Sequence, residues 1–276
     1  MILSPPARTI AALGALLERE TGQRLTESRR WRIETSLRPL MRDEGLATLD
    51  ALVDAIGRDA SGRLRDATID AMLNHESLFF RDPGVFHSIE HRLLPELHAR
   101  KTDRTLRIWS AGCSIGQEAY SIAMILKRMG SLWDGWRVSI LATDVSPLAI
   151  AKARGGLFAQ MDMQRGLPIN ELLRWFVPDG TDWRIHDDLR ALVRFQTDNL
   201  LDPRHATGPF DLILCRNVLL YFPEAQRRQG WAQLARSARP GGYLILGAGE
   251  ILGGQQAAFQ SCRDMSCVYR AAERPR

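Results

Sequence analysis

Two glycines and two acids stand where a nucleotide-like ligand can be held. Gly112 and Gly116 form a short loop after the apolar run 106–111, and Glu118 lies in the first turn of the helical segment that follows. Glycines at a strand-to-helix turn let a ligand approach the backbone closely. Asp144 ends the next apolar run, 28 residues after Gly116. A carboxylate there can accept hydrogen bonds from both ribose hydroxyls of an adenosine.

The chemistry of this loop favours one kind of adenosine ligand. Its GxxxG spacing differs from the GxGxxG of dinucleotide-binding loops. Glu118 would repel a pyrophosphate at the start of its helix but suits a cationic amino group. S-adenosylmethionine carries adenosine, a sulfonium and an α-amino group, and it has no phosphate. Each feature alone also fits a packing turn or a helix cap, but together, on successive strand ends, they favour this cofactor.

The segments around these residues alternate between strand and helix. From Leu106 onwards, apolar runs rich in branched residues alternate with helical stretches, which predicts an α/β fold with a parallel sheet covered on both faces. Residues 155–192 interrupt the alternation and are expected to form an inserted subdomain. Residues 1–73 have helical spacing throughout and predict a small helical domain. The segment 74–105 is then a linker that contributes to the cofactor site, and 106–276 is the main domain.

Composition limits the class of protein. The chain has 276 residues, of which 45% are hydrophobic and 25% charged, as in ordinary globular proteins. The four cysteines form no CxxC pair, and no apolar run approaches the ~18 residues that span a membrane. We therefore expect a cytoplasmic protein without membrane insertion. His87 and His91 have the i, i+4 spacing of a metal-binding helix face but no third ligand nearby, so we expect no metal. We also expect a monomer.

The mild excess of positive charge, +5 in all, is concentrated near the N-terminus. Residues 19–42 contain seven arginines and three acids. On a helical wheel Ile33 and Leu37 share one side, while Arg32, Arg38 and Arg42 lie on the other together with Trp31. A basic helix face of this kind suits docking to an acidic protein, although a solvated surface explains it equally well. Because aromatic residues are not interleaved with the arginines, we expect no nucleic-acid partner.

Three stretches resemble the CheR-type chemotaxis receptor methyltransferases. They are RIWSAGCSIGQEAYSIAMIL, ATDVSPLAIAKARGGLF and FDLILCRNVLLYF, and HESLFFRD is similar to the family motif N-E-[ST]-x-F-F-R. The resemblance covers nearly the whole chain. It implies a Rossmann-like class I methyltransferase sheet of seven strands, a helical N-terminal domain and an inserted β-rich subdomain.

The resemblance also implies roles for individual residues. Tyr221, at the end of a strand, and Arg81 are implied as catalytic, with Tyr221 facing the transferring methyl group. Cofactor contacts are implied for His75, Ser77, Arg81, Glu118, Asp144, Asn199, Leu200, Arg216 and Asn217. Within this set, Ser77 and Arg81 take the methionyl end, Glu118 the amino group, Asp144 the ribose, and Asn199 and Leu200 the adenine. His75 departs from the family pattern, which has asparagine there.

The resemblance thus implies a protein-glutamate O-methyltransferase. It would transfer the methyl group of S-adenosylmethionine to glutamate side chains in the methylation helices of chemoreceptors, leaving S-adenosylhomocysteine and a glutamyl methyl ester. Such a carboxylate is already ionised at pH 7, with an intrinsic pKa of about 4.3, so no general base is needed. The alternative is a signalling module that keeps the fold and binds the cofactor without catalysis.

Overall fold

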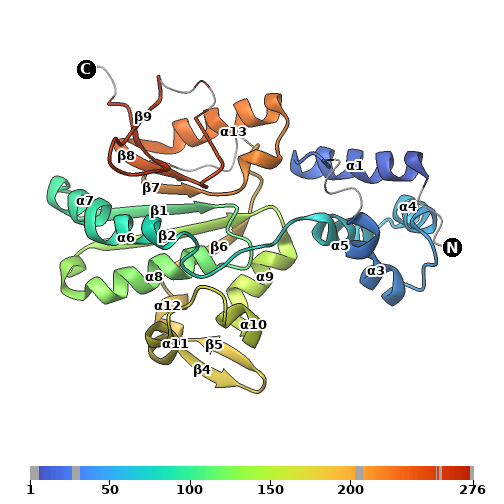
Figure 1. Cartoon of the computed structure of the whole chain (residues 1–276), viewed down its shortest axis with the longest axis horizontal. Coiled ribbons are helices and arrows are strands. Elements are labelled where there is room, and N and C mark those ends of the chain that lie inside the picture. Colours follow the sequence, from blue (N-terminus) through green and yellow to red (C-terminus); the bar gives the residue numbers. More distant parts are fainter. Residues whose placement is uncertain (1–5, 27–31, 203–207, 253, 255–256, 274–276) are drawn as a thin grey trace. The chain divides into compact units, whose positions relative to one another are not determined.

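The chain folds into two compact units. The structure is a computed structural model that describes residues 6–26, 32–202, 208–252, 254 and 257–273. The first unit comprises Met1–His75 and Tyr221–Arg227, and the second Glu76–Leu220 and Arg228–Arg276. Figure 1 shows the elements of both. The domain limits drawn from the sequence stay predictions.

Within residues 6–26 and 32–75, the first unit is built on four helices. They are α1 (Ala7–Thr21), α3 (Ile33–Asp43), α4 (Leu49–Arg58) and α5 (Arg63–Met72). Leu13, Leu17, Leu37 and Leu52 are almost completely buried between them. The apolar spacing of three and four residues places these side chains on one face of each helix. Helix α1 ends at Gly22, whose φ of 77° continues the chain in the left-handed conformation.

The second unit is organised around a sheet of seven strands in the order β6-β2-β1-β7-β8-β10-β9. Strands β1, β2, β6, β7 and β8 pair in parallel, and β10 pairs antiparallel with β8 and β9. Helices α8 (Gln117–Met129) and α9 (Pro147–Gly155) lie below the sheet in Figure 1, and α13 (Glu224–Ser237) lies above it. The strand bounds are β1 (Thr105–Ala111), β2 (Arg137–Asp144), β6 (Val193–Thr197), β7 (Phe210–Cys215), β8 (Ala238–Leu246), β9 (Phe259–Ser261) and β10 (Val268–Ala271). The predicted α/β class and methyltransferase-like sheet are confirmed.

A small antiparallel sheet is inserted between α9 and β6. Its strands β3 (Leu157–Ala159), β5 (Asp182–Ile185) and β4 (Phe176–Asp179) pair in that order, and α10 (Gln160–Met163), α11 (Ile169–Trp175) and α12 (Asp187–Arg190) surround them. Phe158 and Phe176 pack edge-on against Phe79 of the linker, with ring centroids 5.0 and 5.6 Å away. Gly166 lies so close to this linker that a Cβ there would be 2.3 Å from the carbonyl oxygen of Phe79. The insert is therefore packed firmly onto the segment that carries Ser77 and Arg81.

The linker continues into helices that pack on the main sheet. These are α6 (Pro83–Ser88), the π-helix η1 (Ile89–Leu93) and α7 (Leu94–Arg100). Two short 3-10 helices lie elsewhere in the chain: η2 (Gly130–Trp133) follows α8, and η3 (Leu219–Tyr221) follows β7. Phe86, Ile89, Leu93 and Leu97 are buried in the same core as the strands. None of the helices in the described residues has the length and apolar character of a membrane span.

Candidate active site

The carboxyl ends of the parallel strands bring the predicted site residues together. Strand β1 lies between β2 and β7, so the chain order reverses at this point of the sheet. Ala111 pairs with Thr143, and Cys215 at the end of β7 pairs with Leu246. Ligands of open α/β sheets bind in the crevice outside such a reversal point. The loops that follow β1, β2 and β7 therefore surround the expected site.

Asp144 fastens the loop that follows β1. Its Oδ2 accepts the backbone N–H of Ser114 at 2.8 Å, and its Oδ1 accepts that of Ser146 at 3.0 Å. Gly112 has a φ of 78°, and a Cβ there would be 2.3 Å from the Cγ2 of Val218. Glycine is thus required at this position by backbone conformation and by packing. A carboxylate has about four acceptor positions, so Asp144 can hold the loop and also bind hydroxyl groups.

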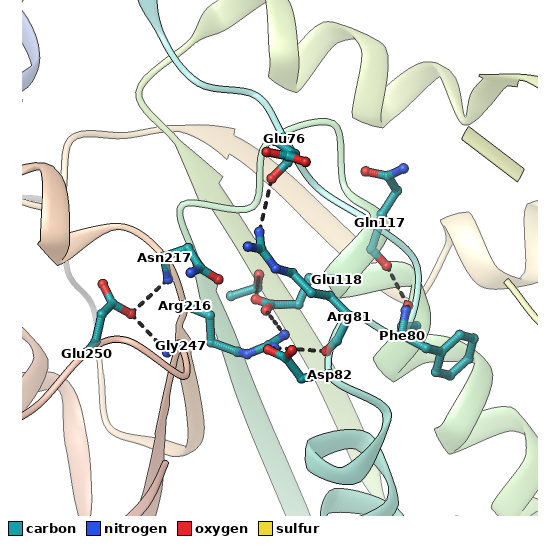
Figure 2. Close-up of polar contacts among 12 residues, drawn as sticks. Glu76, Phe80, Arg81, Asp82, Gln117, Glu118, Arg216, Asn217, Gly247 and Glu250 are labelled. Atoms are coloured by element: carbon teal, nitrogen blue, oxygen red, sulfur yellow. Dashed lines mark hydrogen bonds and ion pairs between the residues drawn. The ribbon is translucent and has the colours of Figure 1, made fainter. Parts of the chain in front are cut away.

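Arg216 is the buried centre of an ion-pair cluster at the end of β7 (Figure 2). Its Nη1 donates to Glu118 at 3.1 Å, and its Nη2 donates to Asp82 at 2.5 Å and to the carbonyl of Arg81 at 2.8 Å. The Arg216 side chain is only 2% exposed. Ser110 donates to the other oxygen of Glu118 at 2.7 Å. Glu118 is therefore held in one position with both oxygens still able to accept further hydrogen bonds.

Arg81 extends into the same space with its charge uncompensated. Among the described residues no carboxylate lies within ion-pair distance of its guanidinium, which donates only to the carbonyl of Glu76, at 3.3 Å. Arg216 links this residue to Glu118, because it donates to the Glu118 carboxylate and to the backbone carbonyl of Arg81. A fixed carboxylate can bind the ammonium group of a free amino acid, and a cation that lacks an anionic partner can bind its carboxylate. The donor set therefore fits the methionyl end of S-adenosylmethionine.

Asn217 offers a further polar group to this space. Its backbone is left-handed, with a φ of 59°, and its Oδ1 is buried without a hydrogen-bond partner in the described structure. A buried unpaired acceptor is costly, and such groups in a crevice point to a missing donor. The structure thus brings Arg81, Glu118, Arg216 and Asn217 to one region, and their roles stay predictions.

Glu250 is a residue of this region that the sequence did not reveal. It is 7% exposed, and its carboxylate accepts the backbone N–H groups of Asn217 and Gly247 at 2.8 and 2.9 Å. The sequence signal for this residue was an acid that follows Gly247 and Gly249 after the end of β8. That pattern is equally typical of an ordinary loop.

The other predicted contacts lie on neighbouring strand ends. Asn199 and Leu200 follow β6 and are half-buried, and the Oδ1 of Asn199 accepts the N–H of Leu201 at 2.9 Å. The N–H of Asp198 donates to the carbonyl of Asp144 at 2.9 Å, which places this loop beside the end of β2. Ser77 is half-buried in the linker.

His75 and Tyr221 belong to the first unit. The Nε2 of His75 lies 3.1 Å from the carbonyl oxygen of Asp70 and 3.2 Å from its carboxylate. The hydroxyl of Tyr221 accepts a hydrogen bond from the Nδ2 of Asn74 at 2.8 Å. Tyr221 lies in η3, six residues beyond the end of β7 at which we expected it, because the chain turns at Asn217. The roles assigned to both residues stay predictions.

Two cysteines near these loops are held in the unreactive thiol form. Cys113 and Cys215 are buried at the ends of β1 and β7. Burial raises the pKa of both thiols well above the usual range, and nearby carboxylates, Asp144 and Glu118 for Cys113 and Glu250 and Glu118 for Cys215, raise it further. Both thiols are therefore protonated at neutral pH.

Comparison with known proteins identifies the family. Residues 75–267 match the SAM-binding domain of the CheR methyltransferases. The chain belongs to the CheR methyltransferase family. Among its relatives is the chemotaxis protein methyltransferase Cher2 of Pseudomonas putida, which is 35% identical over 92% of this chain and 94% of that protein. Chemotaxis protein methyltransferase 1 of Pseudomonas aeruginosa is 36% identical over the same shares, and the chemotaxis protein methyltransferase of Vibrio parahaemolyticus is 39% identical over 90% of each chain.

Family membership settles the cofactor and the general reaction. The prediction of S-adenosylmethionine is confirmed, and so is that of a methyltransferase in chemotaxis adaptation. The uncompensated Arg81 and the unpaired Asn217 acceptor agree with that cofactor.

Proposed function

We propose that this CheR-family protein methylates glutamate side chains of chemoreceptors in the cytoplasm and so produces glutamyl methyl esters. The observation that carries the proposal is the charge arrangement at the strand ends. Glu118 is fixed by Arg216 and Ser110, and Arg81 beside it lacks a carboxylate partner among the described residues. This arrangement holds the methionyl end of the cofactor and has no charged group dedicated to proton transfer.

Each part of the cofactor has a proposed partner in the chain. Glu118 accepts the ammonium, and Arg81 with Ser77 binds the carboxylate. Asp144 accepts from the ribose hydroxyls, and Asn199 and Leu200 lie against the adenine. Arg216 and Asn217 lie beneath the sulfonium, where the buried Oδ1 of Asn217 supplies negative partial charge. His75, where the family has asparagine, completes the proposed set of contacts.

Methyl transfer to a carboxylate requires correct positioning of the two reactants and no acid-base catalysis. The bound cofactor supplies an electrophilic methyl group on a positively charged sulfur. The incoming glutamate is already a carboxylate at pH 7. Opposite charges are lost as the methyl group moves, so exclusion of water by the protein favours the reaction. Arg81 and Tyr221 are proposed to orient the carboxylate of the incoming glutamate.

A basic face of α3 is the proposed receptor contact. Arg32, Arg38 and Arg42 are exposed, while Ile33, Leu37 and Met41 on the other side of the helix are buried. Nearby acids compensate part of this charge, since Arg38 lies 3.9 Å from Glu34 and Arg42 lies 3.0 Å from Asp43. Trp31 falls outside the described residues. Receptor methylation helices rich in glutamate are the proposed partner, and the protein is proposed to act as a monomer.

The proposal is tested with receptor-containing membranes and S-adenosylmethionine labelled in its methyl group. We expect base-labile label in the receptor and one equivalent of S-adenosylhomocysteine per methyl group. Asp134→Ala, which removes an exposed acid outside the site, serves as the control and should be fully active. If the protein binds S-adenosylhomocysteine but leaves every receptor unlabelled, it is a non-catalytic binding module. Acid- and base-stable label would indicate a target other than a carboxylate.

A further inference from the structure

Glu250 makes an unusual set of contacts for a buried acid. Its Oε2 accepts the backbone N–H groups of Asn217 and Gly247 at 2.8 and 2.9 Å. Its Oε1 accepts those of Val218 and Leu220 at 3.0 and 3.2 Å. Among the described residues, no lysine, arginine or histidine lies within ion-pair distance of it. Four peptide donors alone therefore satisfy the carboxylate.

These contacts join two loops. Asn217, Val218 and Leu220 belong to the turn after β7, and Gly247 belongs to the loop after β8. Burial of a charge that lacks a counterion is costly unless the group is fully hydrogen-bonded. The hydrogen bonds of such a carboxylate hold the backbone in a shape that the chain does not adopt by itself.

The shape in question is the left-handed turn at Asn217. A non-glycine residue with a φ of 59° is strained by roughly 1 kcal/mol. Gly247 packs against the same turn, because a Cβ on Gly247 would lie 2.9 Å from the N and the Nδ2 of Asn217 and from the Oε2 of Glu250. Asn217 is thus confined by both a carboxylate and the Cα of a glycine.

We propose that Glu250 is a positioning residue that aims the Oδ1 of Asn217 at the sulfonium end of the bound cofactor. This inference rests on the proposed cofactor contacts of Asn217. Figure 2 shows Asn217 next to Glu250, whose carboxylate accepts its backbone N–H, and its Oδ1 is the unpartnered acceptor described above. Glu250 acts through the backbone of Asn217 and makes no proposed contact with the cofactor itself.

The substitution Glu250→Gln tests the role of the carboxylate with little change in volume. Glutamine has one acceptor oxygen, and its NH₂ group would face two backbone N–H donors. We expect at least tenfold weaker binding of S-adenosylmethionine, which carries the sulfonium, by calorimetry. Adenosine lacks the amino-acid end and the sulfur, so its affinity should change less than twofold. Loss of both affinities in parallel would indicate general damage to the fold and would overturn the proposal.

Asp211→Asn is a matched control at the start of β7, the strand that leads into the Asn217 turn. Asp211 is fully buried, accepts the N–H of Arg107 at 2.8 Å and the Nζ of Lys101 at 2.6 Å, and pairs with Arg239 at 2.8 Å. Its substitution should lower the melting temperature and leave the affinity for S-adenosylmethionine unchanged. If Asp211→Asn weakens this affinity as much as Glu250→Gln does, the effect is one of stability and the positioning role is wrong.

Gly247→Ala tests the same turn with the carboxylate intact. Its φ is not left-handed, so alanine is acceptable to the backbone, but the new Cβ presses on Asn217. We expect the same selective loss for S-adenosylmethionine over adenosine. If this variant binds both as the wild type does, the position of Asn217 is irrelevant to the cofactor and the inference fails. If the wild type itself fails to bind S-adenosylmethionine, the proposed cofactor contacts fail first.

Discussion

At the scale of single residues, the site depends on a few carboxylates whose neighbours fix their position. Glu118 is held by Arg216 and Ser110, Asp144 by two backbone N–H groups, and Glu250 by four. Groups that are fixed before the ligand arrives cost less conformational entropy when it binds. This arrangement leads to predictions for two side chains.

Asp144→Ala should weaken the binding of S-adenosylmethionine at least tenfold, as measured by calorimetry. The substitution removes charge-assisted hydrogen bonds that each contribute roughly 1.5–3 kcal/mol, and it also frees the N–H groups of Ser114 and Ser146. Asp134→Ala serves as the control for charge. Unchanged affinity in Asp144→Ala would contradict the assignment of this residue to the ribose.

Tyr221→Phe should keep the fold and the cofactor affinity but lose about tenfold or more in turnover, equivalent to about 1.4 kcal/mol of barrier. The hydroxyl accepts a hydrogen bond from the exposed amide of Asn74, which water can satisfy after the substitution. A contact made mainly during the reaction lowers kcat rather than binding. Single-turnover assays on receptor membranes measure this, and wild-type turnover would leave Tyr221 as a packing residue.

At the scale of elements, two helices carry predictions of their own. The charge-reversed variant Arg38→Glu with Arg42→Glu should methylate receptors more slowly while it binds the cofactor normally. Methylation by the wild type should weaken with salt, since exposed charges are screened beyond about 10 Å at 0.1 M. Arg8→Glu with Arg58→Glu changes the net charge equally at exposed positions outside α3 and should be active. Normal methylation by the α3 variant at low and high salt would make this face a solvated surface only.

Arg128 of α8 connects the insert to the main domain. It donates to Glu90 of η1 at 2.7 Å and pairs with Glu171 of α11. The hydrogen bond from Arg128 holds the pKa of Glu90 below its ordinary value of 4.5. A carboxyl with a lowered pKa in the folded state adds stability above its unfolded pKa and loses it as the pH falls through the folded value.

Arg128→Met should therefore lower the free energy of unfolding at pH 7 by about 2 kcal/mol, between the values typical of exposed and of buried pairs. The difference from the wild type should narrow as the pH falls from about 5 to 3, where Glu90 becomes protonated. Urea unfolding at several pH values measures this. A difference that is constant over this range would mean that the arginine contributes by packing alone.

The sequence predicted elements and strand-end residues better than it predicted the turns between them. Alternating strands and helices placed Glu118 and Asp144 correctly, because the carboxyl ends of parallel strands meet at one edge. Glu250 was missed because its role comes from peptide N–H groups in two loops, which leave no side-chain pattern. Tyr221 was expected at a strand end because the left-handed turn at Asn217 has no glycine to signal it.

At the scale of the whole molecule, cofactor binding and stability are linked. S-adenosylhomocysteine at 100 times its Kd should stabilise the native state by about 2.7 kcal/mol, which is roughly 5–10 °C in Tm for a domain of this size. In a protein of two compact units, the shift should appear in the unfolding transition of the second unit. NAD at the same concentration serves as the control. A shift with NAD and none with S-adenosylhomocysteine would contradict the cofactor assignment.

The buried thiols have a consequence for the chemical fidelity of the protein. A bound methyl donor threatens the chain that holds it, because sulfur anions are better methyl acceptors than carboxylates. The thiolate is the reactive form of cysteine, and the raised pKa values of Cys113 and Cys215 suppress it at the two strand ends nearest the loops of the site. The same carboxylates that shape the site, Asp144, Glu118 and Glu250, reinforce this suppression. Both thiols therefore stay in the weakly nucleophilic protonated form while a methyl donor is bound nearby.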